Sequence, residues 1–235
     1  MLGKSYPPYR YRLTVEIDTP EGLRRGLSVI EVRTSVAGPY TIPNPGQVFT
    51  RIKGQAVAVD LPNGQTLFAL LRSDWESQWA DHVYSRLVPR PSQEEVKARS
   101  PDGKWNGDLD FDMWMERILA LRGPQTVPRR WSLMGKDVSN WPMFVRFRDI
   151  RDPASVERVD PDDLKAAFGK GYRVRRIIAE RTEDEVGGQT STRLNKSFFQ
   201  AWATQSKAAL NNGALDNPYF QKLKGKLSRN DFIGE

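Results

Sequence analysis

The sequence predicts an α+β fold: a mostly antiparallel sheet or small β-sandwich built from hairpins, with three or four amphipathic helices packed on it. Several short runs alternate apolar and polar residues and are separated by Pro, Gly and Asn, which is typical of strands joined by tight turns. Other runs repeat apolar residues at helical spacing. The elements do not follow the regular β–α–β alternation of a parallel nucleotide-binding sheet, which favours an antiparallel arrangement.

Two hairpins are expected in the N-terminal part of the chain. Residues 9–17 alternate apolar and polar side chains, and residues 27–32 return as the partner strand after a turn that contains Pro and Gly. The second hairpin joins residues 56–61 to 65–71 through Asn63-Gly64, a pair that favours a primed turn. Its strands are apolar on both faces, so we expect them to be covered on both sides.

Helices and strands follow one another in the rest of the chain. Ser73 and Glu76 fit a capping box, and Trp75, Trp79 and His82 then recur at helical spacing, which predicts a helix over this segment. The other expected elements are helices at about 110–122, 160–168 and 195–210, strands at 143–148 and 172–181, and loops at 37–46 and 89–107.

The composition excludes several classes of chemistry. The chain has 235 residues, no Cys and one His, which excludes disulfides, thiol nucleophiles, Cys-ligated metals and two-His metal sites. The formal net charge of +7 is spread along the chain, whereas a nucleic-acid binder usually presents a basic stripe or arm. No run approaches ~18 consecutive apolar residues, so no membrane-spanning helix is predicted.

Phosphate-binding and nucleophile motifs are missing from the sequence. It has no Gly-x-x-x-x-Gly-Lys-Ser/Thr, no Gly-x-Gly-x-x-Gly, no Gly-x-Ser-x-Gly and no kinase signature set. Gly169-Lys170-Gly171 follows a predicted helix and does not open one, so we interpret it as a helix C-terminal cap. No cofactor is therefore expected.

One polar segment carries the candidate metal ligands. Laid over a calcium-binding loop, Asp102, Asn106 and Asp108 take ligand positions and the required Gly is in place. Lys104 and Met113, however, stand where the loop needs oxygen ligands. We interpret the segment as a turn followed by an acidic helix N-terminus, where carboxylates meet the positive end of the helix dipole, and predict no metal site.

The catalytic candidates are few, and the catalytic residues stay unknown at this stage. Asp108, Asp110 and Asp112 could supply a carboxylate pair for hydrolysis, with or without a metal. They lie in a polar segment, where carboxylates stay solvated and keep ordinary pKa values. His82 lies near an apolar helix stripe, and a packed, hydrogen-bonded role is its simpler interpretation. The sequence therefore favours binding over catalysis.

The binding candidates are loop aromatics and their basic neighbours. Trp105, Trp131 and Trp141 fall in segments predicted to be loops, whereas the other four Trp lie on apolar helix stripes. Exposed Trp side chains are common at interfaces. Arg129 and Arg130 form one of the densest basic sites of the chain and directly precede Trp131. We expect these five residues to contact a macromolecular partner.

The domain organisation is expected to be simple. Residues 1–215 are predicted to form a single α+β domain, within which a hairpin-rich part, 1–88, and a helix and strand part, 108–215, can be separated. Residues 216–235 are polar and lysine-bearing, and we expect them to form a tail. The patterning indicates no oligomeric state.

Two stretches carry a resemblance to a known group of proteins. The first is Tyr11–Gly22 with Ser28–Val32, and the second is Val145–Val156 with Val159–Leu164 and Phe168-Gly169. In these stretches, which cover about a third of the chain, the sequence resembles uncharacterised proteobacterial proteins, some of them similar to envelope lipoproteins. The resemblance implies a bacterial origin and favours the envelope as a location, but it carries over no functional residue.

The sequence as a whole favours a non-enzymatic bacterial binding or accessory protein that recognises a macromolecular partner, such as another protein. Two alternatives stay open: a carboxylate-dependent hydrolase, and a nucleic-acid-binding protein whose affinity would fall steeply with salt. This chain alone indicates a cytoplasmic location. A periplasmic or envelope location would follow if the native protein begins with a signal segment.

Overall fold

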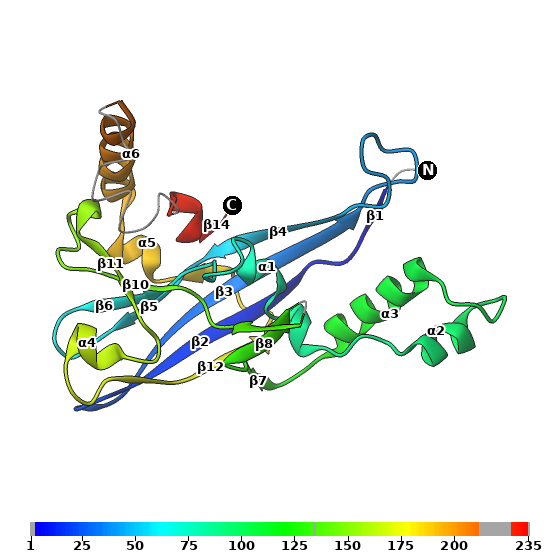
Figure 1. The fold of residues 1–235 in the computed structure, drawn as a ribbon, viewed down its shortest axis with the longest axis horizontal. Coiled ribbons are helices and arrows are strands. Elements are labelled where there is room, and N and C mark those ends of the chain that lie inside the picture. Colours follow the sequence, from blue (N-terminus) through cyan, green and yellow to red (C-terminus); the bar gives the residue numbers. More distant parts are fainter. Residues whose placement is uncertain (1–2, 134, 212–226, 235) are drawn as a thin grey trace.

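The structure, a computed structural model, describes residues 3–133, 135–211 and 227–234, and it has the predicted α+β architecture with a mostly antiparallel sheet (Figure 1). The described helices and strands are β1 (Lys4–Ser5), β2 (Tyr9–Thr19), β3 (Gly22–Val36), β4 (Val48–Gln55), β5 (Val57–Asp60), β6 (Thr66–Ala69), α1 (Trp79–His82), η1 (Ser85–Leu87), α2 (Gln93–Arg99), α3 (Gly107–Ala120), β7 (Pro124–Thr126), β8 (Arg130–Leu133), β9 (Lys136–Ser139), β10 (Phe144–Phe147), η2 (Pro153–Ser155), β11 (Val156–Val159), α4 (Leu164–Phe168), β12 (Arg173–Arg181), β13 (Gly187–Gly188), α5 (Thr190–Arg193), α6 (Lys196–Asn211), η4 (Arg229–Asp231) and β14 (Ile233–Gly234).

A long antiparallel sheet runs through the molecule in the order β14-β4-β3-β2-β12-β7, and β1 and β13 also pair with β3. Strands β2 and β3 form the predicted first hairpin, from Tyr9 opposite Val32 to Thr19 opposite Gly22. In Figure 1 these strands extend from the end that carries α4 to the end that carries the arm of α2 and α3. One strand therefore contributes residues to both ends of the molecule.

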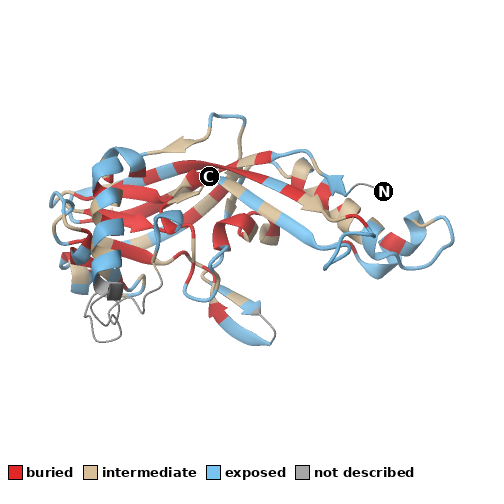
Figure 2. Ribbon diagram, turned by 90° about the horizontal axis from the view of Figure 1, so that it is seen from above, coloured by how far each residue is buried: buried red, intermediate tan, exposed pale blue. Residues whose placement is uncertain are grey.

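A second sheet, in the order β11-β10-β6-β5, forms a middle layer. One of its faces packs with the apolar face of β2 in the larger core, through residues such as Val59 and Leu67. Its other face packs against α6 and the segment after residue 226, through residues such as Phe68 and Val145. This arrangement confirms that the second hairpin, now β5 and β6, is covered on both sides. Figure 2 shows the buried residues gathered in the sheets, whereas the tip of the α2–α3 arm is exposed.

Most of the predicted helices and strands occur with bounds shifted by a few residues, but two predictions for the segment before α3 are wrong. Ser73 does accept hydrogen bonds from the backbone N–H groups of Trp75 and Glu76, at 3.3 Å and 3.1 Å. The Glu76 carboxylate, however, binds His82 and Arg86 and does not return to Ser73, so only half of the capping box forms. The result is a turn followed by the short α1. Trp75 is consequently 65% exposed and lies on no buried stripe.

The second error is the loop predicted at 89–107, which contains the helix α2. Ser92 and Glu95 form a complete capping box there, with Glu95 N–H donating to the Ser92 hydroxyl at 3.2 Å and Ser92 N–H donating to the Glu95 carboxylate at 2.6 Å. Only Val96 of this helix is buried, so the apolar periodicity that reveals most helices is missing. None of the helices among the described residues is both long and apolar enough to cross a membrane.

The outer face of the large sheet buries two carboxylates beneath arginines. The side chain of Glu16 is 2% exposed and receives Arg25 at 2.8 Å and Arg176 at 2.7 Å. Glu31 is covered in the same way by Arg10 and Arg33. Hydrogen bonds from the arginines hold the pKa of both carboxyls below the usual range. Each carboxylate binds two arginines, so both groups keep a net positive charge.

Replacing Glu16 with Gln is expected to lower the free energy of unfolding at pH 7 by about 1–2 kcal/mol, because two charge-assisted hydrogen bonds are weakened and the arginine partners of this buried carboxylate are themselves half-exposed. Since the folded-state pKa of Glu16 is depressed, its contribution is complete above the unfolded pKa of about 4.3 and is lost as the pH falls through the folded pKa. Urea unfolding at pH 7, 5, 4 and 3 should therefore show the two proteins converging below about pH 4. Glu21→Gln, at an exposed site, should change little, and a pH-independent loss in Glu16→Gln would contradict this account.

Candidate functional site

Among the described residues, the outer edge of β4 is unpaired over most of its length. β4 pairs with β3 from Val48 opposite Val36 to Lys53 opposite Glu31. On its other side, β14 pairs only with Gly54 and Gln55. No described strand therefore covers the edge of residues 48–53. A free edge offers a row of unpaired backbone donors and acceptors to any further strand.

The backbone hydrogen bonds identify which residues point toward this edge. Ala56 N–H donates to the carbonyl of Phe232 at 2.8 Å, on the β14 side. Because backbone groups alternate along a strand, Ile52 and Thr50 direct their N–H and C=O groups to the same side as Ala56. A hydrogen bond at the other end of β4 supports this alternation. The Gln47 carbonyl points toward β3, where it accepts from Ala37 N–H at 2.8 Å, so the even-numbered residues of β4 point to the opposite side. The free edge thus carries the peptide groups of Thr50 and Ile52, in line with the β14 ladder.

The side chains beside this edge are basic. Arg51 lies directly opposite Arg33 on β3, and Lys53 lies two residues further along the same face. Like charges directly opposite each other destabilise a sheet. Arg33 binds Glu31 at 2.8 Å, but no carboxylate of the described residues forms an ion pair with Arg51 or Lys53. The edge therefore holds positive charge that the described chain does not neutralise.

A shallow cavity of about 580 Å³ follows the basic side chains. Arg33, Arg51 and Lys53 line it together with Val186 and Ile233, so it lies between β3, β4, β13 and β14. It is on the sheet face opposite Thr50, because side chains alternate along β4. A ligand that follows the β4 edge would lie beside this cavity.

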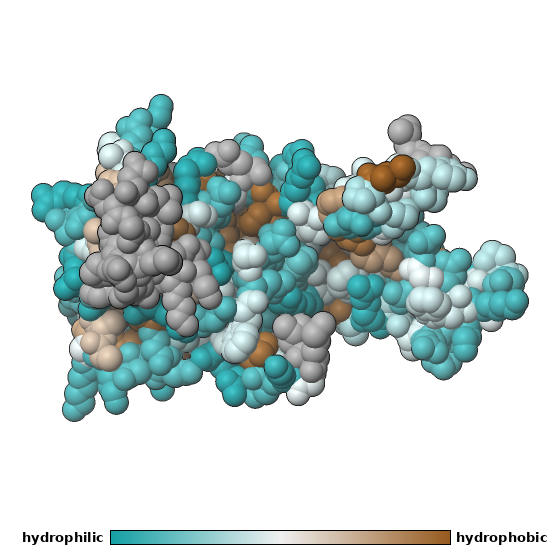
Figure 3. Space-filling model, turned by 45° about the horizontal axis from the view of Figure 1, so that its top comes forward, coloured by the Kyte–Doolittle hydropathy of each residue, from teal (hydrophilic) through white to brown (hydrophobic). Residues whose placement is uncertain are grey.

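Apolar residues stand at the far end of the same strand. Phe49 is 43% exposed and Val48 is 44% exposed, and the adjoining loop holds Tyr40 and Ile42 at 84% and 91% exposure. In Figure 3 apolar surface is visible at this end of the molecule. Along β4, exposed apolar and basic side chains thus follow one another, which suits a ligand with both apolar and acidic groups.

The sequence-predicted binding residues form two separate groups. Arg129, Trp131 and Trp141 lie around the β8–β9 hairpin, where Trp141 donates a hydrogen bond to the Val127 carbonyl at 3.2 Å and the Arg129 guanidinium is 4.9 Å from the Trp141 ring. Trp105, 54% exposed, lies in the loop between α2 and α3. Both views place that loop and the β8–β9 hairpin apart (Figures 1 and 2). The three tryptophans therefore do not form one surface.

The two predicted basic residues are already paired. Arg129 binds Asp162, and its hydrogen bonds hold the pKa of Asp162 below the usual range. Arg130 binds Asp137 at 2.8 Å. Trp131 is half-buried, with the Arg86 guanidinium 6.0 Å from its ring. This hairpin offers less uncompensated charge than the β4 edge.

The predicted acidic candidates lie at the start of α3 and are mostly engaged. Asp112 accepts hydrogen bonds from Lys4 and from the Tyr6 hydroxyl at 2.5 Å, and Asp110 binds Arg90 at 3.1 Å. Asp108 lies in the exposed first turn of the helix. The Lys4 and Tyr6 hydrogen bonds lower the pKa of Asp112, whereas a general acid needs a raised one.

The candidate metal ligands serve as local caps. Asp102 accepts hydrogen bonds from the Ser100 hydroxyl at 2.8 Å and from Lys104 N–H at 3.0 Å, and Asn106 caps α3 by accepting from Leu109 N–H. Within the described residues, no group of three or more Asp, Glu or His side chains is arranged to hold a metal ion.

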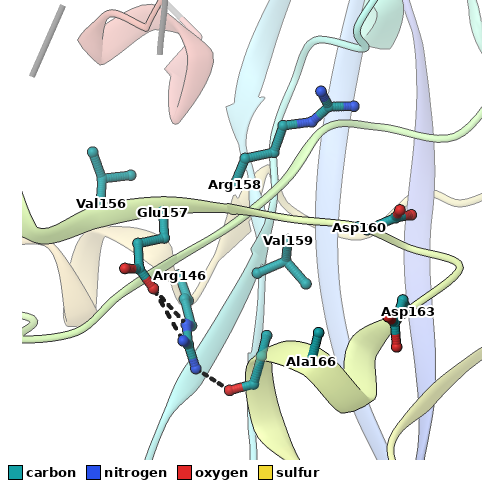
Figure 4. A pocket seen from close by; sticks show the side chains of 9 residues that line it. Arg146, Val156, Glu157, Arg158, Val159, Asp160, Asp163 and Ala166 are labelled. Carbon is teal, nitrogen blue, oxygen red and sulfur yellow. Dashed lines mark hydrogen bonds and ion pairs between the residues drawn. The ribbon is translucent and has the colours of Figure 1, made fainter. Parts of the chain in front are cut away.

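Another cavity, of about 460 Å³, lies between β11 and α4 (Figure 4). Arg146 points into it and is held by Glu157 at 3.0 Å and by the Ala167 carbonyl. Figure 4 also shows Arg158 directed away from the α4 side, where it binds Asp74. Both arginines of this cavity are paired with carboxylates, whereas Asp160 and Asp163 form no ion pair among the described residues. The cavity therefore offers no uncompensated positive charge, and we place the candidate site at β4.

Comparison with known proteins identifies no relative for this chain: no family model, curated protein or solved structure matches it. The resemblance to uncharacterised proteobacterial proteins therefore stays a prediction. A proposal for its function therefore rests on the protein's own surface.

Proposed function

We propose that this protein is a binding protein that takes an extended, acidic segment of a partner protein onto the free edge of β4. One observation carries the proposal: the unpaired backbone of Thr50 and Ile52 coincides with the basic side chains of Arg51 and Lys53. An extended peptide can use both features. Its backbone would add a strand to the sheet, and its acidic side chains would reach the basic cavity.

A peptide is favoured over a nucleic acid by the same features. A nucleic acid cannot form the alternating backbone hydrogen bonds that Thr50 and Ile52 offer. Arg10 and Arg25 of the outer face already bind carboxylates of this chain, so they are less available to phosphate groups than Arg51 and Lys53. The exposed Phe49 also suits an apolar side chain of a peptide.

The proposal predicts binding of a labelled probe peptide, acetyl-Thr-Val-Glu-Val-Glu-Val-Thr-amide, measured by fluorescence anisotropy. The double variant Arg51→Glu/Lys53→Glu should bind it at least about tenfold more weakly, because two attractive charges become repulsive. The matched control Lys97→Glu/Lys165→Glu makes the same change in net charge at exposed sites elsewhere. Equal losses in both double variants would mean that only the overall charge matters and would contradict the site.

A second experiment tests the strand pairing itself. Thr50→Pro removes an N–H that points away from β3, so the ladder with β3 stays intact, and Pro is tolerated on an edge strand. This variant should lose the probe peptide while keeping the circular dichroism and unfolding midpoint of the parent. A probe N-methylated at alternate amides should also fail to bind. If a single-stranded oligothymidylate binds the parent and the peptide does not, the nucleic-acid alternative replaces this proposal.

A further inference from the structure

A second, smaller cavity of about 240 Å³ lies on the inner face of the large sheet, between β4, α1 and α3. Its walls are mainly apolar and include Tyr9, Phe111, Trp114, Met115 and Ile118. A dry cavity of about 150 Å³ is large enough for benzene, so this one can hold a ring with a short substituent. It opens beside β4 but does not include the basic residues of the outer face.

One carboxylate in this cavity has no partner side chain among the described residues and is hydrogen-bonded only by its own backbone N–H. Asp81 is 7% exposed, and no other described residue donates a hydrogen bond to its carboxylate or forms an ion pair with it. Burial raises the pKa of Asp81 to about 6. A carboxylate in apolar surroundings is costly unless a cation or donor accompanies it. The cavity therefore has a place for positive charge that the described chain does not fill.

The cationic side chains at the rim are directed to other groups. His82 Nδ1 lies 2.6 Å from Glu76 Oε1, and Arg86 binds the same carboxylate. The Arg90 guanidinium stacks 3.6 Å from the Trp114 ring centre and binds Asp110 at 3.1 Å. These contacts direct the basic groups to other carboxylates, and His82 lowers the pKa of Asp81 only through space, with no ion pair between them. Aromatic faces also line the cavity, and such faces attract cations.

We propose that this cavity binds an organic cation: a primary ammonium compound with an apolar arm about the size of a benzyl group. Its ammonium would lie at Asp81, and its ring would pack against Trp114, Met115 and Ile118. This site lies on the sheet face opposite Arg51 and Lys53, although the Thr50 side chain lines it. Charge changes at Asp81 and at the basic residues of the edge therefore test the two sites separately. The class of ligand follows from the charge of Asp81, and the size of the ligand follows from the volume of the cavity.

The test uses benzylammonium as the probe, with benzyl alcohol and benzoate as matched neutral and anionic compounds. Calorimetry at pH 7.5 should show binding in the order benzylammonium, benzyl alcohol, benzoate, and Trp fluorescence should change because Trp114 lines the site. Asp81→Asn should weaken benzylammonium at least about tenfold, the loss of one charge-assisted contact, and should leave benzyl alcohol unchanged. Asp137→Asn, at an exposed site, should alter neither. Benzylammonium binding no tighter than benzyl alcohol would overturn the proposal.

Two further experiments test the site: the pH dependence of benzylammonium binding, and a variant whose larger side chain fills the cavity. Benzylammonium affinity should fall as the pH drops through about 6 and Asp81 becomes protonated, and it should be flat in Asp81→Asn. Other titratable or charged groups also surround Asp81: His82, Glu76, Tyr9, Tyr11 and Arg90. They are unchanged in Asp81→Asn, so the comparison with this variant isolates Asp81. Thr50→Leu fills space in the cavity and leaves Asp81 in place, so it should weaken benzylammonium and benzyl alcohol together. Full binding by Thr50→Leu would place the ligand elsewhere.

Discussion

Phe147→Ala is expected to lower the free energy of unfolding by about 3–5 kcal/mol, as large-to-small changes of buried aromatics do. Phe147 is 5% exposed and lies at the centre of the aromatic cluster on the outer side of the middle sheet. Its ring centre is within 5.1–6.3 Å of the rings of Phe68, Phe198, Trp202 and Phe232. Removing it leaves a cavity that three different chain segments border. Chemical denaturation followed by far-ultraviolet circular dichroism measures the loss.

The cluster also attaches α6 and the segment 227–234 to the sheet. Amide hydrogen exchange should therefore show which segments lose stability in the variant. In Phe147→Ala, amides of α6 should exchange faster than amides of β2, because the β2 core does not contain Phe147. Phe49→Ala, at a 43% exposed position, serves as the control and should cost less than about 1 kcal/mol. A loss in Phe147→Ala as small as the control would show that the cluster does not hold these layers together.

The strands with clear alternation could be predicted from sequence because the pattern of apolar and polar residues lies within a single short segment. In β2 every second residue from Tyr9 to Ile17 is apolar and buried, and the partner strand needs only a turn. β4 was assigned no element, although it too alternates: Val48, Thr50 and Ile52 face inward, whereas Phe49, Arg51 and Lys53 face outward. Its inner face is half-buried and contains Thr, so the contrast between faces is small. The alternation of β4 is therefore too weak to predict a strand with the sequence alone.

The residues of the two proposed sites were harder to find because their roles depend on distant partners. The exposed charge of Arg51 becomes notable only when Arg33 is known to lie opposite it, and register is not encoded in either segment alone. Asp81 was missed for a related reason. The helix that carries Asp81 packs against β4, and its cavity is lined by residues such as Thr50 and Met115, which are more than thirty positions away on either side. No local pattern distinguishes such a carboxylate from an exposed one.

The candidate sites that the sequence did suggest illustrate the opposite case. Trp105, Trp131 and Trp141 were selected because they stand in polar segments, and Trp105 is indeed exposed. Trp141, however, packs against the larger core and donates a hydrogen bond to Val127. A loop can bury a tryptophan when it folds back on a sheet, and composition does not reveal that contact.

Asp81→Asn is expected to raise the free energy of unfolding at pH 7 by about 2 kcal/mol, because it removes a buried charge while keeping the shape of the side chain. The pKa of Asp81 is raised to about 6 in the folded protein, against about 3.9 in the unfolded chain. The folded state therefore holds the proton more tightly. The resulting stabilisation of the parent protein is complete below the unfolded pKa and is lost as the pH rises through about 6.

Urea unfolding of both proteins at pH 4, 5, 6 and 7 measures this effect, and the difference between them isolates Asp81 from the other carboxylates. The variant should be the more stable protein at pH 7, and the difference should vanish near pH 4. Saturating benzylammonium should raise the stability of the parent at pH 7 by mass action and have less effect on the variant. Asp81 would then lower the stability of the free protein, and bound benzylammonium would restore that stability. Such behaviour is expected of a binding residue. If Asp81→Asn is instead less stable at pH 7, a partner for the carboxylate exists within the chain, and Asp81 is a structural residue.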